Sequence, residues 1–88
     1  MADTDVAIYL GGLDAHLATL APAAALAAIE GERERVERAE RELARWCVKG
    51  AGMRRSHAPT RFTAIELALL DGELSIRAAR IREHGGVA

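Results

Sequence analysis

The chain has 88 residues and a formal net charge of −1; half of it is apolar, yet it holds only one Trp, one Tyr and one Phe. This length allows one domain at most, spanning residues 1–88, and the near-neutral charge argues against a polybasic nucleic-acid or membrane binder. The lone Cys47 excludes an internal disulfide. Because we find neither a signal-peptide pattern nor an apolar run of ~20 residues, we expect a cytoplasmic protein.

The first predicted element is a helix over residues 5–20, approximately. Apolar residues recur there at alternating steps of four and three, which places them on one helical stripe. Asp3, Thr4 and Asp5 precede the stripe and suit the positive end of a helix dipole. The stripe consists of Val6, Leu10, Leu13, Leu17 and Leu20.

The second predicted helix is long and covers about residues 22–49. Pro22 fits its first position, where a missing backbone N–H is not needed. A narrow apolar line follows, with Ile29, Val36 and Leu43 seven residues apart. Most other positions between residues 30 and 45 are charged with mixed sign, so we expect a broad solvated face and one arm of a helical hairpin.

Residues 50–62 form a predicted loop, which we call the basic elbow. Its glycines and Pro59 disfavour helix. Arginine side chains match phosphate and carboxylate geometry, so the elbow is a candidate site for an anion or an acidic protein surface. The alternative is a solvated loop, or one that pairs with the acidic N-terminal helix. The candidate residues are Lys49, Arg54, Arg55, His57 and Arg61.

The third predicted helix runs from residue 64 to about residue 84. Thr63 and Glu66 match a capping box, Phe62 and Leu67 match a hydrophobic staple, and the glycines at 85–86 end the helix. Two apolar stripes follow this start. One contains Ile65, Leu69, Ile76 and Ala79. The other contains Leu67, Leu70, Leu74, Ala78 and Ile81, and we expect four of these, Leu67, Leu70, Leu74 and Ile81, to form a face for a second copy or another partner.

Residues 66–82 also resemble a degenerate helix-turn-helix, in which Arg77, Arg80 and Arg82 would contact DNA. Acidic residues at 71 and 73 stand where that motif takes apolar ones. One apolar stripe also continues through Gly72 without a change of phase, which favours a single helix. Whether Gly72 breaks the helix therefore decides between the two interpretations.

No pattern for catalysis or metal binding is present. The three histidines, at 16, 57 and 84, are widely separated and have no cysteine partner, whereas a metal site needs three or four converging ligands. We interpret Cys47 as a small buried apolar residue rather than a reactive thiol. We therefore expect no enzyme activity, no cofactor, no metal and no small-molecule substrate.

Together these patterns predict an all-α fold of three helices, with a short N-terminal helix packed on a long antiparallel helical hairpin. The predicted function is a small non-catalytic interaction protein: an accessory, adaptor or inhibitor that docks on a larger protein or nucleoprotein complex. We expect a protein partner and a homodimer, and no membrane. The alternatives are a dimeric DNA-binding transcriptional regulator and a structural self-assembling subunit. The small size fits a phage or mobile-element origin.

Overall fold

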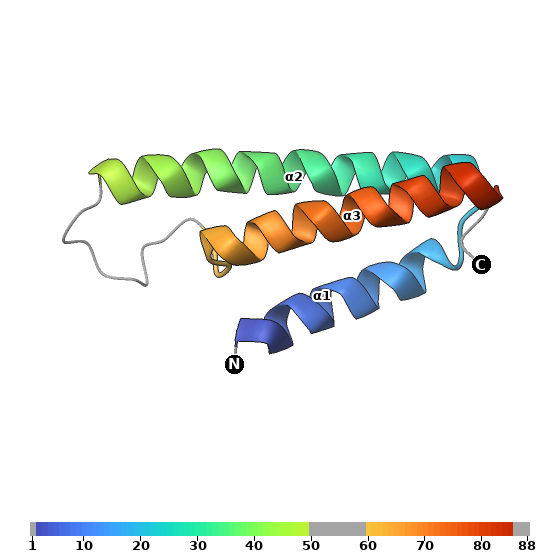
Figure 1. The fold of residues 1–88 in the computed structure, drawn as a ribbon, viewed down its shortest axis with the longest axis horizontal. Coiled ribbons are helices and arrows are strands. Elements are labelled where there is room, and N and C mark those ends of the chain that lie inside the picture. Colours follow the sequence, from blue (N-terminus) through green and yellow to red (C-terminus); the bar gives the residue numbers. More distant parts are fainter. Residues whose placement is uncertain (1, 50–59, 86–88) are drawn as a thin grey trace.

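Three helices and no strand make up the part of the chain that the structure, a computed structural model, describes: residues 2–49 and 60–85 (Figure 1). Helix α1 spans Ala2–Leu17, α2 spans Pro22–Lys49 and α3 spans Ala64–His84. The all-α prediction is confirmed. The predicted bounds of the second and third helices agree with α2 and α3.

The predicted bounds of the first helix are wrong by about one turn at each end. Helix α1 begins at Ala2 rather than residue 5 and ends at Leu17 rather than residue 20. The end has a clear cause: Thr19 N donates to His16 O, and Leu20 N donates to Leu17 O, both at 3.0 Å. These three-residue bonds tighten the chain into a turn. The residue before Pro22 also avoids helical angles.

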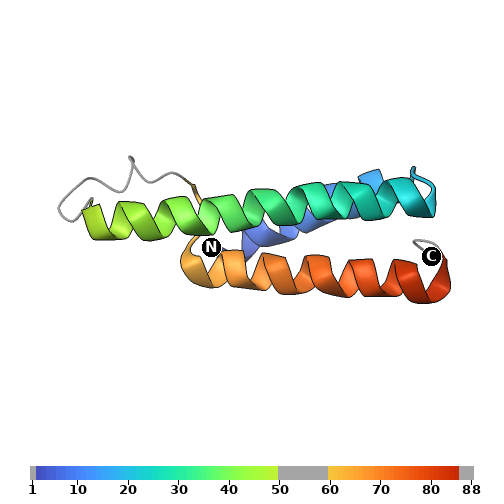
Figure 2. The same ribbon diagram turned by 90° about the horizontal axis from the view of Figure 1, so that it is seen from above.

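Helices α2 and α3 lie antiparallel as a hairpin, and α1 packs on α3 along one side of it (Figures 1 and 2). Every helix contributes one apolar stripe to a single core. In α2 the predicted heptad residues Ile29, Val36 and Leu43 are only 0%, 5% and 5% exposed. The core residues are Val6, Leu13, Leu17, Ala25, Ile29, Val36, Leu43, Leu67, Leu70, Leu74, Ala78 and Ile81.

Both ends of α3 are closed by the predicted capping residues. Glu66 N donates to the Thr63 hydroxyl at 3.2 Å, and Thr63 N donates to Glu66 Oε1 at 2.8 Å. This reciprocal pair satisfies two backbone donors that a helix start leaves free. At the other end Gly85 takes a φ of 68°, a left-handed angle that glycine adopts without a Cβ clash. Thr63 thereby fixes the residue at which α3 begins.

None of the helices, within the residues described, combines the length and apolar character needed to cross a membrane.

Candidate functional site

Helix α3 carries a row of apolar side chains that points away from α1 and α2. We call Ile65, Leu69, Gly72, Ile76 and Ala79 the outer stripe, and all five are exposed. Its large members Ile65, Leu69 and Ile76 are 83%, 47% and 46% exposed. The steps of four, three, four and three keep the stripe on one line of a 3.6-residue helix.

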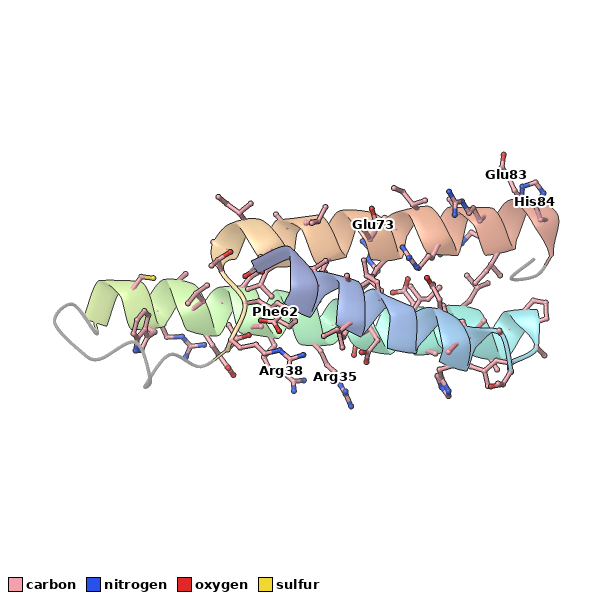
Figure 3. All side chains as sticks on the ribbon, turned by 90° about the horizontal axis from the view of Figure 1, so that it is seen from below. Arg35, Arg38, Phe62, Glu73, Glu83 and His84 are labelled. Atoms are coloured by element: carbon pink, nitrogen blue, oxygen red, sulfur yellow. The ribbon has the colours of Figure 1, made fainter. Side chains whose placement is uncertain are left out.

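The outer stripe lies on the side of α3 opposite its core residues. Figure 3 shows α3 to one side of the other two helices, with Glu83 directed away from both. Glu83 follows Ala79 by four residues and so continues the same line. Exposed large apolar residues that occur singly need no explanation, whereas an aligned set is typical of a contact surface.

The stripe of α3 that was predicted to contact a partner is buried, and the other apolar stripe is exposed. The residues predicted to meet a partner, Leu67, Leu70, Leu74 and Ile81, are only 0–3% exposed. They pack against α1 and α2 within one chain, so a partner has no access to them. The free face is the outer stripe, which the sequence analysis identified as apolar but did not choose as the contact surface.

The helix-turn-helix alternative requires a turn within residues 66–82, and the structure has none there, because α3 is one continuous helix from Ala64 to His84. Gly72 lies inside this helix without breaking it, and a Cβ built there meets no atom within 4 Å. No turn separates a supporting helix from a recognition helix at 66–82. The observation that was to decide between the two interpretations therefore favours the single helix.

Arg77 is the first of the three arginines predicted to contact DNA, and its guanidinium is bonded to acidic residues of the same chain. Its Nε donates to Asp14 Oδ1 at 2.6 Å and its Nη2 donates to Asp14 Oδ2 at 2.9 Å. Its Nη1 donates to Glu73 Oε1 at 2.8 Å. The side chain is only 17% exposed. This bidentate pair links α1 to α3 and leaves the guanidinium no free edge for a phosphate.

The Arg77 guanidinium also changes the titration of its partner. The hydrogen bond from Arg77 holds the pKa of Asp14 below its ordinary value. Arg80 is exposed, and Arg82 lies 3.9 Å from the Glu30 carboxylate on α2. Two of the three arginines, Arg77 and Arg82, thus have acidic partners within the chain.

The basic elbow falls mostly outside the described residues. That holds for Arg54, Arg55, His57 and the side chain of Lys49, so the anion-site prediction stays a prediction. Arg61 is described and exposed. Its guanidinium carbon lies 4.9 Å from the centre of the Phe62 ring, a distance at which the cation and the ring attract each other.

Two aromatic residues, Tyr9 and Phe62, make a contact that the sequence did not predict. Tyr9 Oη donates to Glu32 Oε1 at 2.6 Å, and the Tyr9 and Phe62 rings meet edge to face at 6.2 Å between centres. Burial and this hydrogen bond raise the pKa of the Tyr9 hydroxyl. The only hint in the sequence was that Tyr9 follows Val6 by three residues.

Two shallow cavities border Tyr9. The larger measures about 380 Å³ and is lined by Tyr9, Leu13, His16, Ala28 and Glu32. The smaller measures about 180 Å³ and lies between Tyr9, Val36, Phe62 and their neighbours. Neither lining contains Ser, Thr, Cys or Lys among the described residues, and Glu32 is already bonded to Tyr9 and paired with Arg35 at 3.4 Å.

Two other kinds of site, a metal centre and a reactive thiol, were considered in residues 2–49 and 60–85. No three His, Cys, Asp or Glu side chains converge there as a metal site requires. Cys47 is exposed, so its predicted burial is wrong. The cause is the length of α2, which extends past the start of α3 (Figure 1). No part of the chain that the structure describes covers that residue.

Comparison with protein-family models, with curated proteins and with solved structures finds no match to this chain.

Proposed function

We propose that the chain is a small non-catalytic interaction protein, and that the outer stripe of α3 is its docking face. One observation carries the proposal: three large aliphatic side chains, Ile65, Leu69 and Ile76, are 46–83% exposed on one line of a single helix. The helix does not need these residues for its own packing, because its core face is already filled by other residues. Covering them removes apolar surface from water and thus favours binding.

The shape of the stripe favours a helical ligand. It is straight and narrow; the small residue Gly72 separates Leu69 from Ile76, and the small residue Ala79 follows Ile76. Ridges of a second helix fit such gaps. The two cavities near Tyr9 give a weaker case for a small-molecule site, because the Tyr9 and Glu32 polar atoms already bond to each other.

The proposal is tested by affinity capture with the tagged chain and two matched variants. Ile76→Glu places a charge in the middle of the outer stripe. Ile8→Glu makes the same change at an isoleucine on α1 that is 64% exposed and faces away from the core. Circular dichroism first establishes that both variants keep their helix content.

A supporting result is an identified protein that the wild type and Ile8→Glu retain and that Ile76→Glu loses. Equal retention by Ile76→Glu places the docking face elsewhere. A wild-type chain that retains no protein and also stays monomeric contradicts the proposal.

A further inference from the structure

We propose that the helix bound by the outer stripe is α3 of a second copy of this chain, aligned antiparallel. This inference rests on the proposed function and names the occupant of the same face. It follows from the pattern of large and small residues along the stripe and from the charge at its end.

The stripe is complementary to itself only when the two helices run in opposite directions. With the twofold axis near Leu74, Ile76 of one copy lies opposite Gly72 of the other. Leu69 then lies opposite Ala79. Two of the three large side chains thus meet a small one, which is how helices interdigitate without voids.

A parallel pair would fit poorly along the same line. Like residues would then face each other, so that Gly72 meets Gly72 and leaves a gap. Glu83 would meet Glu83 at the end of the seam. Like charges held at this spacing oppose association.

Antiparallel alignment gives Glu83 a favourable neighbour. It brings Glu83 beside Ile65 of the second copy, at the first turn of that α3. A helix start carries partial positive charge, which attracts a carboxylate. The Glu83 side chain is exposed and points away from α1 and α2 (Figure 3), so it is free to lie there.

The area of the contact is small. From Ile65 to Glu83 the stripe is about 27 Å long and roughly 10 Å wide, which gives about 300 Å² per copy. A stable interface takes about 800 Å² per partner. We therefore infer a weak dimer that forms at high concentration and exchanges readily.

The test is cross-linking through cysteines placed beside the stripe, in a Cys47→Ser background. One protein carries Ala68→Cys and the other carries Arg82→Cys. Both sites are exposed and neither belongs to the stripe. In an antiparallel pair, position 68 of one copy lies beside position 82 of the other. In a parallel pair those positions are about 20 Å apart, since 14 residues of helix separate them.

A short thiol-specific bifunctional reagent is added to each protein alone and to the mixture, at high and at low concentration. The proposal predicts that the mixture yields the 68–82 dimer in several-fold excess over the 68–68 and 82–82 products at high concentration. Introducing Ile76→Glu into both cysteine variants abolishes the 68–82 product. Introducing Ile8→Glu into both does not. Preferential 68–68 and 82–82 products overturn the antiparallel arrangement.

Absence of any dimer product, with a mass that stays at 9.4 kDa at high concentration, overturns self-pairing altogether. The capture experiment distinguishes that failure from a failure of the proposed function. If an identified protein still binds and is lost with Ile76→Glu, the outer stripe remains the docking face and its occupant is another protein.

Discussion

Two leucines of α3 have opposite environments, and truncating each one tests how the helix is oriented. Leu74 is 0% exposed and Leu69 is 47% exposed. Leu74→Ala opens a cavity between α3 and its neighbours, for which core Leu→Ala changes give a loss of about 3 kcal/mol. Leu69→Ala leaves no closed cavity, and about half of its side chain is already in water, so the expected loss is about 1 kcal/mol.

The difference is large compared with the total stability, which for a chain of this length is roughly 4–13 kcal/mol. The assay is urea unfolding followed by far-UV circular dichroism at low protein concentration, where self-association does not contribute. With a denaturant slope of about 1 kcal/mol per M, Leu74→Ala lowers the urea midpoint by about 3 M and Leu69→Ala lowers it by about 1 M. Equal shifts, or a larger shift for Leu69→Ala, would mean that α3 is rotated about its axis.

Three further outcomes follow from single contacts. Thr63→Ala removes the capping hydrogen bond to Glu66 N and should lower the free energy of unfolding by about 1 kcal/mol, measured by the same urea titration; no change would mean that the cap contributes nothing. Arg77 lowers the pKa of Asp14 in the folded chain, so the stability from this pair is present at neutral pH and is lost as the pH falls below about 4, the ordinary pKa of an aspartate. Asp14→Asn should therefore be less stable than the wild type at neutral pH, and the gap should narrow progressively as the pH falls below the ordinary pKa of an aspartate; a constant gap would remove the ion pair as its cause. Burial and Glu32 raise the pKa of Tyr9, the chain's one tyrosine, so tyrosinate absorbance should appear only well above pH ~10, and a normal titration would show that the Tyr9–Glu32 bond does not persist in solution.

Most of the fold could be predicted because the deciding signals are local. Pro22 begins α2, and the Thr63–Glu66 capping box begins α3. The heptad line through Val36 and the stripe through Leu74 set the buried sides of these helices. Each signal needs only residues a few positions apart, and the structure confirms each one.

The candidate site could be predicted only in part. Both stripes of α3 are apolar, and their periodicity alone does not show which one is buried and which one is exposed. The structure buries the stripe with closely spaced leucines and exposes the one that Gly72 interrupts. Three-dimensional packing explains this choice: the buried stripe packs against α1 and α2 in the core, and a residue without a side chain at Gly72 would leave a void there.

Contacts between distant residues could not be predicted either. Arg77 reaches Asp14, which is 63 positions away in the sequence, and Tyr9 reaches Glu32, 23 positions away. No local pattern shows that these side chains meet. The charge of Arg77 suggested DNA contact when the residue was considered with its sequence neighbours alone, and the position of α1 removes it from the surface.

The most direct test of the central claim is a dilution series of the isotope-labelled chain followed by amide chemical shifts. We predict that shifts change with concentration along the outer stripe, at Leu69, Gly72, Ile76 and Ala79, and that they stay constant at Ile8 on α1. Concentration-dependent shifts confined to α1 or α2 would contradict the account, because they would place the contact surface on another helix.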